Sequence, residues 1–264
     1  MSGLKQKNKK LLQTVYNDFG NFTDLYQADF SRFCEELCFL ESNLRDKKGK
    51  LLDIACGPGI LSAALSSAGF EVTGADKYIF PEHQYNYFNI KDIESLKLLW
   101  NKYKIKVVGE DYLNLPKHFS SESFEVIVCD AFVEHLSISP RHLFNIAHGL
   151  LKKDGNFLLT TPNVVSALKR FRFLAGKSCL WDIKEFWRAD LFLGHHREYT
   201  IEELKFMCAE AGFEVVDIKT KNVFPLGDFR KNGLKNFVGR LFSRLISYVL
   251  PNSGEMIYLL ARKK

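Results

Sequence analysis

The sequence predicts an α/β fold with a doubly wound, mostly parallel sheet that carries helices on both faces. Short apolar runs that end in glycine or aspartate alternate with helical segments of about ten to fifteen residues, as successive βαβ units require. The chain has 264 residues, and 46% of them are hydrophobic, which is enough for a sizeable core. We therefore expect a single domain over residues 1–264.

The expected elements follow this alternation from the N-terminus. Residues 10–46 space their apolar side chains at helical intervals, so a helical cover over residues 1–46 should precede the sheet. Strands are expected at 50–56, 71–76, 105–111, 124–132, 156–163, 213–220 and 255–262. Helices are expected at 60–70, 90–103, 140–151 and 200–212.

The C-terminal part departs from simple alternation. Thr200 followed by Glu203 gives the capping-box pattern at the start of the last of these helices. A basic region then separates the last two expected strands, in place of an ordinary crossover. We therefore expect an antiparallel final strand at that edge of the sheet.

The stretch LLDIACGPGILS, residues 51–62, joins the first expected strand to the helix that follows. In a doubly wound sheet, ligands bind at the carboxyl ends of the strands, near the switch point beside the first strand. Gly57 and Gly59 would let the backbone pass close to a bound group, and the helix presents free N–H donors. Such glycines can also serve packing alone, so the evidence for a ligand site comes from the carboxylates at later strand ends.

Three aspartates fall at one edge of the predicted sheet. Asp53 precedes the glycine loop, Asp76 ends the second strand and Asp111 follows the third. A carboxylate at Asp76 can accept from both hydroxyls of a ribose, and one at Asp111 can accept from the exocyclic amine of a purine. A single acid at a strand end is commonly a helix cap, but three in succession predict a nucleoside site.

A nicotinamide cofactor is the minor alternative for this site. The fingerprint of that class is G-x-G-x-x-G. Here Gly57 and Gly59 are followed by Ser62, where the third glycine would stand. An acid four residues before the first glycine is not part of that fingerprint either.

At these residues the sequence resembles the class I S-adenosylmethionine-dependent methyltransferases. The resemblance runs in consistent order over roughly residues 50–220. It passes through LLDIACGPG, VTGAD, GEDYLNLP, FEVIVCDAFVEHL, LLKKDGNFLLTTPN and GHHREYTIEELKFMCAEAGFEVV. It implies a Rossmann-like, seven-stranded sheet, S-adenosyl-L-methionine as cofactor, and a cofactor-binding core over residues 50–160.

Carried over by position, the resemblance assigns a cofactor site. The implied residues are Asp53, Ala55, Cys56, Gly57, Gly59, Asp76, Lys77, Asp111, Tyr112 and Cys129. Asp76 would hold the ribose, Asp111 the adenine amine, and Tyr112 would lie beside the ring. The segment between Asp76 and Asp111 is longer and more aromatic than in many relatives, which leaves the adenine contacts open.

Two histidines are candidates for a catalytic base. Methyl transfer to an alcohol oxygen benefits from such a base, and histidine suits it near neutral pH. His195 matches the histidine of the family's H-x-R-x-[YF] pattern, so we expect it as the base. His135, after the fourth strand, is the second candidate, with a structural role as its alternative. Arg197 and Tyr199 are the expected substrate-binding partners.

Residues 162–197 and 222–250 should cover the pocket and select the acceptor. The stretch TPNVVSALKRFRFLAGK loosely resembles one in bacterial methyltransferases of glycan and surface-polysaccharide synthesis. Its interleaved lysines and arginines suggest a small, sugar-like acceptor that carries phosphate, such as a nucleotide-linked sugar. An RNA or lipid-linked acceptor, or a non-catalytic cofactor-binding subunit, stays as an alternative.

Charge and cysteine usage bear on partners and location. The net charge of +6 is modest for a nucleic-acid partner, so we do not expect one. Residues 229–250 are basic and amphipathic without any acid, which suits an anionic membrane surface, although packing on the chain's own domain is the simpler interpretation. The six cysteines form no CxxC pair, so we expect no metal site, and a cytoplasmic enzyme.

Overall fold

The computed structural model describes residues 2–44, 48–77, 90–224, 234–247 and 249–264. The aromatic segment that departs from the resembling family falls almost entirely on residues 78–89, outside the described residues. Part of the expected 222–250 segment also falls outside them.

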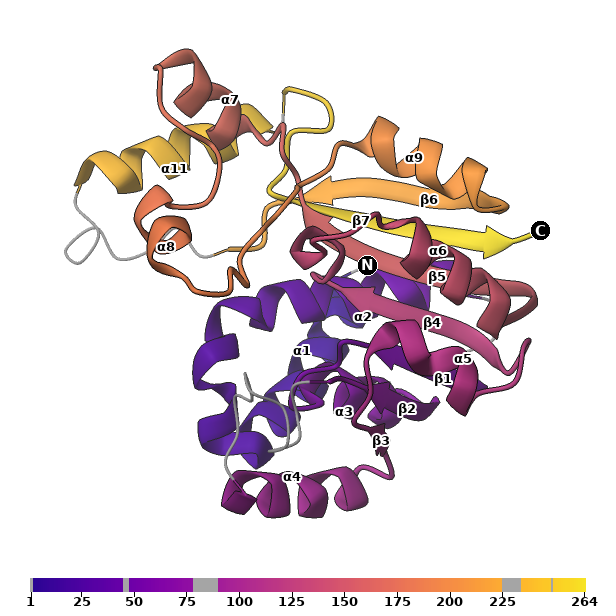
Figure 1. Ribbon diagram of the computed structural model, residues 1–264. Coiled ribbons are helices and arrows are strands. Elements are labelled where there is room, and N and C mark those ends of the chain that lie inside the picture. Colours follow the sequence, from indigo (N-terminus) through magenta and orange to yellow (C-terminus); the bar gives the residue numbers. More distant parts are fainter. Residues whose placement is uncertain (1, 45–47, 78–89, 225–233, 248) are drawn as a thin grey trace.

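A seven-stranded sheet forms the centre of the protein (Figure 1). Its strands are β1 (Lys50–Ile54), β2 (Glu71–Ala75), β3 (Lys106–Val108), β4 (Phe124–Asp130), β5 (Leu151–Pro162), β6 (Phe213–Lys221) and β7 (Met256–Lys263). Their order is β3-β2-β1-β4-β5-β7-β6. The pairs from β3 to β5 are parallel, and β7 is antiparallel to both β5 and β6. The predicted doubly wound sheet with an antiparallel last strand is confirmed.

The place of β7 differs from the expectation. This strand lies between β5 and β6, so β6 and not β7 forms the edge of the sheet. Residues Met256–Ala261 of β7 are all buried, whereas β6 is fully buried only at Phe213. Because an interior strand is covered on both faces, the more continuously apolar segment takes that position.

Two element boundaries also differ. The third strand is limited to Lys106–Val108, and the expected continuation to residue 111 is a loop. The fifth strand begins at Leu151 rather than at 156, directly after the preceding helix. Phe124 of β4 pairs with Leu151, and Val126 pairs with Asn156, so residues 152–155 of β5 form a bulge. Their sequence, KKDG, is typical of a turn, and the start of the strand was therefore predicted too late.

Helices cover both faces of the sheet. They are α1 (Ser2–Phe19), α2 (Phe30–Asn43), α3 (Ile60–Ser67), α4 (Ile90–Lys102), α5 (Leu115–His118), α6 (Arg141–Leu150), α7 (Ala167–Leu174), α8 (Ile183–Arg188), α9 (Ile201–Glu210) and α11 (Leu234–Ser247). One core cluster packs the helices α1, α2, α3 and α4 on one face of the sheet and includes Leu51 of β1. The other packs α5, α6 and α9 on the opposite face and includes Leu52. Successive strand residues point to opposite faces, which separates the two clusters.

The capping box predicted for α9 is present. The Thr200 Oγ1 accepts from the Glu203 backbone N–H at 3.2 Å, and the Glu203 Oε2 accepts from the Thr200 N–H at 2.8 Å. This cap fixes the start of α9. The segment before α9 carries His195 and His196 and reaches the functional site.

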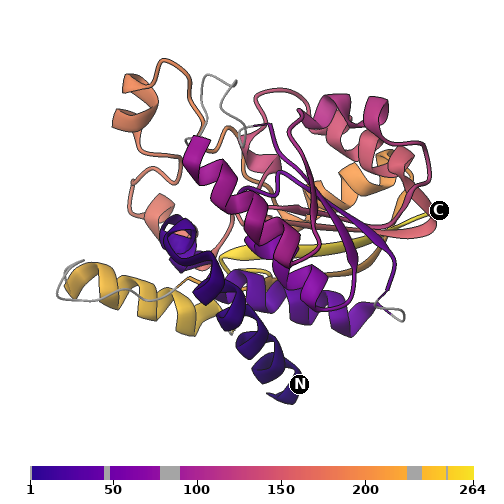
Figure 2. The same ribbon diagram turned by 90° about the horizontal axis from the view of Figure 1, so that it is seen from below.

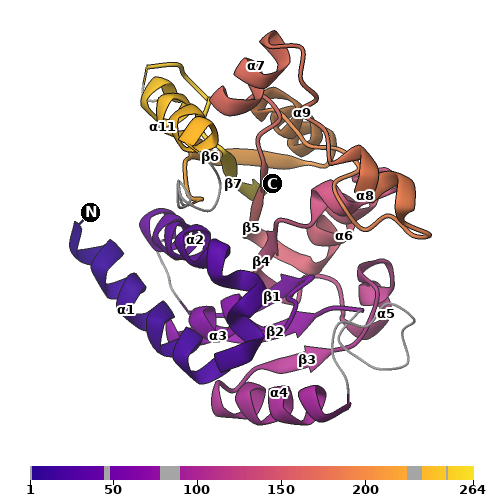
Figure 3. The ribbon, with the colours of Figure 1, turned by 90° about the vertical axis from the view of Figure 1, so that its left-hand side faces the viewer.

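The helices α7, α8 and α11 lie toward the end of the molecule opposite the C-terminal end of β7, with α7 beside α11 and α8 apart from α11 (Figures 1 and 2). Phe171 of α7 and Phe242 of α11 pack with ring centroids 5.4 Å apart. Figure 3 looks onto this end, toward which the parallel strands run. Among the helices that the structure describes, none combines the length and the apolar character of a membrane crossing.

Candidate active site

A cavity of about 660 Å³ opens at the carboxyl ends of β1, β2 and β4. Its size suits a cofactor together with a small acceptor. The predicted site residues that line it are Asp53, Ala55, Cys56, Gly57, Asp76, Lys77, Asp111, Tyr112 and His135. The predicted site residues outside its lining are Gly59, Cys129, His195, Arg197 and Tyr199.

The loop between β1 and α3 has a left-handed backbone at its glycines. Gly57 and Gly59 have φ angles of 54° and 91°, which favour glycine. A Cβ at Gly57 would lie 2.8 Å from the Tyr26 Oη, and one at Gly59 would lie 3.1 Å from the Trp100 Nε1. That Nε1–H donates to the Pro58 carbonyl at 2.8 Å. Both glycines are therefore required by backbone conformation and by close neighbours.

Two aspartates assigned to the nucleoside face the cavity. The Asp76 Oδ2 accepts from the Gly57 N–H at 3.0 Å, which ties the end of β2 to the glycine loop. The Asp111 Oδ2 accepts from the Lys77 Nζ at 2.9 Å, and its Oδ1 accepts from the Leu113 N–H at 3.0 Å. Carboxylate oxygens have several lone pairs, so each can accept further hydrogen bonds. Their ribose and adenine roles stay predictions.

Asp53 lies beneath the loop, inside β1, with only 1% of its surface exposed. Its Oδ2 accepts from the Ser62 Oγ of α3 at 2.6 Å. Burial raises the pKa of Asp53 to about 7, and the Ser62 hydrogen bond opposes that rise. Asp53 therefore fastens the first turns of α3 to the sheet under the cavity.

Arg32 of α2 is a cavity residue that the sequence analysis missed. It is 5% exposed and lines the cavity together with Asp130 of β4. Its Nη1 donates to the Asp130 Oδ1 at 2.7 Å, and its Nη2 lies 3.1 Å from the Asp29 Oδ1. The available signal was an arginine among the apolar positions of a helix, because buried arginines are normally paired with acids.

Glu36 lies one helical turn beyond Arg32 and is fully buried. Burial, followed by the nearby Asp130, raises its pKa well above the ordinary value. Among the described residues, no donor reaches either carboxylate oxygen, and the Asp130 carboxylate lies beside them. This environment favours the protonated form of Glu36, and Arg32 is compensated by Asp29 and Asp130.

The two candidate bases occupy different places. His135, at the end of the short helix η3 (Val133–His135), lines the cavity, and its Nδ1 lies 2.7 Å from the Leu193 carbonyl oxygen. Burial lowers the pKa of His135. The neutral ring therefore donates its Nδ1–H to Leu193 and keeps Nε2 as an acceptor. His195 packs edge-on behind it, with ring centroids 4.9 Å apart.

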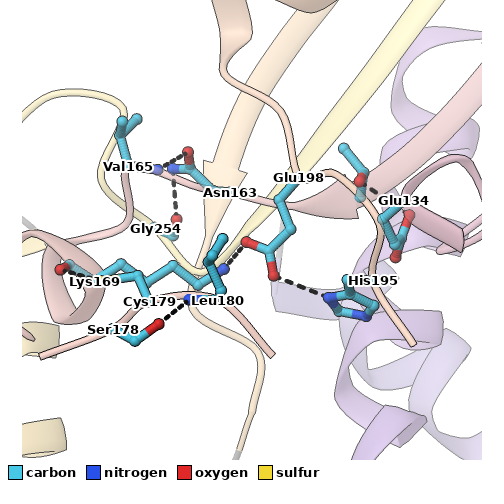
Figure 4. Close-up of polar contacts among 11 residues, drawn as sticks. Glu134, Asn163, Val165, Lys169, Ser178, Cys179, Leu180, His195, Glu198 and Gly254 are labelled. Carbon is cyan, nitrogen blue, oxygen red and sulfur yellow. Dashed lines mark hydrogen bonds and ion pairs between the residues drawn. The ribbon is translucent and has the colours of Figure 1, made fainter. Parts of the chain in front are cut away.

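His195 belongs to a chain of polar contacts behind the cavity (Figure 4). Its Nδ1 lies 2.9 Å from the Glu198 Oε1, and Glu198 also forms an ion pair with Lys169 of α7. Burial lowers the pKa of His195 to about 3, so the neutral ring donates to Glu198. His135 and not His195 lines the cavity, because His195 packs against Trp181 and His135; which of the two acts as the base stays a prediction.

Glu134 ties the two histidine segments together. Its Oε2 accepts from the Thr161 Oγ1 at 3.0 Å, and its backbone carbonyl accepts from the His196 N–H at 2.7 Å. Burial raises the pKa of Glu134 to about 7. Glu134, His135 and His195 each offer one atom of a metal-binding type, and these atoms lie within 4.8 Å of one another. The expectation that the protein has no metal site stays a prediction.

Three predicted residues have structural places instead of cavity places. Cys129 is fully buried in the core, and Asp130 lines the cavity because neighbouring strand residues alternate between faces. Arg197 pairs with Glu203 of α9 at 2.6 Å on the outer surface. Tyr199 is 3% exposed and packs in the core. Cys129, Arg197 and Tyr199 therefore lie outside the cavity lining, and their predicted cofactor and acceptor roles stay predictions.

The end of the cavity around His135 is largely apolar. Its apolar lining comprises Phe132, Leu136, Ile138, Leu191, Phe192 and Leu193. The basic residues of α7 lie outside the lining. Of the residues that the structure describes, the cations in the lining are Arg32 and Lys77, and both are paired with aspartates. The described basic residues of α7 therefore lie apart from the cavity lining, and a phosphate on the acceptor stays a prediction.

The polar end of the cavity fits S-adenosylmethionine. The glycine at position 57 leaves the space that a Cβ would take, and the Asp76 carboxylate and the Tyr112 ring face the same cavity. A carboxylate beside a glycine loop is the hydrogen-bond acceptor that ribose hydroxyls require. Arg32 and Asp130 add one charge of each sign near the loop, as an amino-acid group would need. Together with the sheet, these features define a class I S-adenosylmethionine-dependent methyltransferase.

Comparison with known proteins agrees with this class. Residues 26–218 match the family described as "Methyltransferase domain", so the chain belongs to that methyltransferase family. It is 27% identical over 163 residues to the ubiquinone biosynthesis O-methyltransferase of Histophilus somni, covering 60% of this chain and 62% of that one. A second such enzyme, from Haemophilus ducreyi, is 32% identical over 114 residues, covering 43% and 45% of the two chains. The chain thus matches less than two thirds of the length of these relatives.

Solved structures show the same fold. A methyltransferase from Archaeoglobus fulgidus superposes with a TM-score of 0.55 at 18% identity, covering 87% of this chain and 92% of the other. One from Methanosarcina mazei gives 0.56 at 20% identity, covering 85% and 96%. The chain therefore belongs to the methyltransferase family and has the fold of these S-adenosylmethionine-dependent enzymes, and the nicotinamide alternative gains no support from the comparisons.

Proposed function

We propose that the protein transfers the methyl group of S-adenosylmethionine to a hydroxyl oxygen of a small acceptor, with His135 as the general base. The observation that carries this proposal is the place of His135. It lines the apolar end of the cavity, and its Nδ1 is engaged by the Leu193 carbonyl, which leaves Nε2 to accept a proton.

Bound S-adenosylmethionine supplies an electrophilic methyl group on a sulfonium. The chain contributes alignment and proton removal. The glycine loop, Asp76 and Asp111 would hold the nucleoside, and Arg32 with Asp130 would face the charged amino-acid part. During transfer to the acceptor oxygen, the His135 Nε2 would accept the proton that the acceptor hydroxyl gives up. The carbonyl of Leu193 then stabilises the imidazolium through the Nδ1–H.

The apolar lining favours an acceptor with an apolar body next to its hydroxyl. The relatives are named as O-methyltransferases of ubiquinone biosynthesis, which supports transfer to oxygen. The sugar-like, phosphate-bearing acceptor suggested by the sequence gains no support from these relatives. Acceptors of this kind, and RNA, are therefore included in the test below.

The test is methyl transfer from labelled S-adenosylmethionine to a panel of phenols, catechols, free sugars, nucleotide sugars and RNA. We expect label in a phenol or catechol, attached through oxygen, and loss of transfer in His135→Ala. Arg197→Ala is the matched control, because that side chain pairs with Glu203 on the surface. Label confined to RNA or to nucleotide sugars, or equal turnover in His135→Ala, would contradict the proposal.

A cytoplasmic location also remains part of this proposal. All six cysteines are free thiols, and four of them are buried. Free buried thiols are compatible with a reducing compartment.

A further inference from the structure

The segment from α7 to α8 exposes an unusual amount of apolar surface. Trp187, Leu174 and Leu180 are 84%, 82% and 82% exposed, and Phe173 is 75% exposed. The described part of α11 adds Val238, Phe242 and Leu245, each more than half exposed. We call these seven residues the lid surface. α7 packs on α11, and α8 follows α7 along the chain. A soluble monomer rarely leaves so many large apolar side chains in water, so the lid surface indicates a contact.

The lid surface is continuous with the cavity. Asp190 to Leu193 directly follow α8 and line the apolar end of the cavity. The Trp181 ring packs on His195 with centroids 4.6 Å apart. Phe171 and Phe242 hold α7 against α11. Whatever covers α8 therefore lies next to the segment that lines the apolar end of the cavity.

The charge of these elements identifies the kind of contact. No acidic residue occurs from Asn163 to Trp181, nor from Phe229 to Leu250, although both stretches contain several lysines and arginines. Arg172 and Lys177 are exposed beside the apolar side chains of α7. Lys169 of α7 is paired with Glu198, and α8 carries the exposed acids Asp182 and Glu185 near Trp187, so the excess of positive charge lies on α7 and not on α8. Exposed phenylalanine and leucine beside such cations are typical of elements that lie on an anionic lipid surface.

We propose that the lid surface docks on the surface of an anionic lipid bilayer. The aromatic and aliphatic side chains of α7 and α8 enter the headgroup boundary, and the cations of α7 face the lipid phosphates. This places the apolar end of the cavity at the membrane interface, where an apolar acceptor would be concentrated. The docking site extends the basic stretch expected at 229–250 to α7 and α8, and it requires no particular acceptor.

The test is flotation of the purified full chain with phosphatidylcholine vesicles, with and without phosphatidylglycerol, in the absence of cofactor and acceptor. We expect binding to the mixed vesicles, at least about tenfold stronger than to phosphatidylcholine alone, and weakened by high salt. The paired variants Leu174→Ser and Trp187→Ser should each reduce the partition coefficient by about threefold to tenfold, since each removes one inserted side chain.

Leu98→Ser is the matched control. Leu98 on α4 is 72% exposed but lies outside the lid surface, so its change should leave vesicle binding unaltered. S-adenosylmethionine titration of every variant reports that the fold is intact, and it would separate a failed docking site from a failed cofactor site. Equal effects of Leu98→Ser and Trp187→Ser, or no binding to the mixed vesicles, would overturn the proposal. Concentration-dependent dimers that Trp187→Ser abolishes would also overturn it, because the lid surface would then be a protein interface.

Discussion

The two ends of the cavity are built in different ways. At the polar end, which we assign to the cofactor and call the cofactor end, hydrogen bonds join the Gly57 N–H to Asp76, Lys77 to Asp111 and Ser62 to Asp53. At the acceptor end, loops after β4 and α8 bring apolar side chains and His135 together, and the outer side of the second loop adjoins the exposed lid surface. Cofactor affinity and acceptor turnover should therefore depend on separate residues, and each variant below tests that separation.

The largest expected effect belongs to His135→Ala. If this residue removes the acceptor proton, its loss should lower turnover by about 10²–10⁴ while the affinity for S-adenosylmethionine changes little. His195→Ala should lower turnover less, because His195 packs behind His135 outside the cavity lining. Steady-state kinetics at saturating cofactor would show the order. A greater loss in His195→Ala would restore the assignment that the sequence suggested.

The pH dependence of turnover sharpens the same assignment. A base must be neutral, and burial lowers the pKa of His135 from the ordinary 6.5. The rate should therefore be constant at neutral pH and fall only as the pH drops below 6.5. A kcat profile between acid and neutral pH provides the check. A fall that begins above pH 7, or none at all, would show that another group controls the reaction.

Arg32→Met probes the boundary between the two ends. The substitution leaves Asp29 and Asp130 without their buried cation, which should reduce the free energy of unfolding by about 3–5 kcal/mol. Chemical denaturation would measure it, and Arg32→Lys should retain part of the stability because it keeps the charge. Equal stability of Arg32→Met and the native chain would mean that the pairs contribute nothing net.

Asp76→Asn should act on the cofactor end alone. Replacing the carboxylate weakens its hydrogen bonds to ribose hydroxyls and to the Gly57 N–H, so S-adenosylmethionine should bind about 1–3 kcal/mol less tightly. Calorimetric titration is the measurement. Unchanged affinity in Asp76→Asn would remove this residue from the cofactor site.

The smallest effect is expected for Arg197→Ala. The Arg197 side chain is 64% exposed, and its ion pair with Glu203 lies on the surface, so stability should fall by less than about 1 kcal/mol. Turnover should stay close to native. A large rise in the acceptor KM would return Arg197 to the acceptor site, where the sequence pattern had placed it.

The cofactor end of the cavity could be predicted from the sequence much better than the acceptor end. The cofactor end follows from one strand, its glycine loop and aspartates at successive strand ends, and all but Gly59 and Cys129 of its predicted residues line the cavity. Residue periodicity alone would have separated Cys129 from Asp130, because they alternate on β4. The acceptor end depends on how residues far apart in the chain pack. Which of His135 and His195 reaches the cavity was fixed by contacts with Trp181 and Leu193, which no local pattern contains.

The interior place of β7 has the same cause. Its apolar run was visible in the sequence, but the choice between edge and interior depends on competition with β6 for burial on both faces. Arg32 is a second residue whose role could not be predicted from local sequence. Its position in a helix was predictable, whereas its pairing with Asp130, 98 residues later, required the packing of α2 on the sheet.

One measurement tests the central claim most directly: cofactor affinity and the single-turnover rate at saturating cofactor, for the native chain, Asp76→Asn and His135→Ala with one acceptor. The separation of the two ends predicts that affinity falls mainly in Asp76→Asn and that the rate falls mainly in His135→Ala. If both quantities fall together in both variants, or if His135→Ala loses cofactor affinity and keeps its rate, the cavity does not have one end for the cofactor and another for the acceptor.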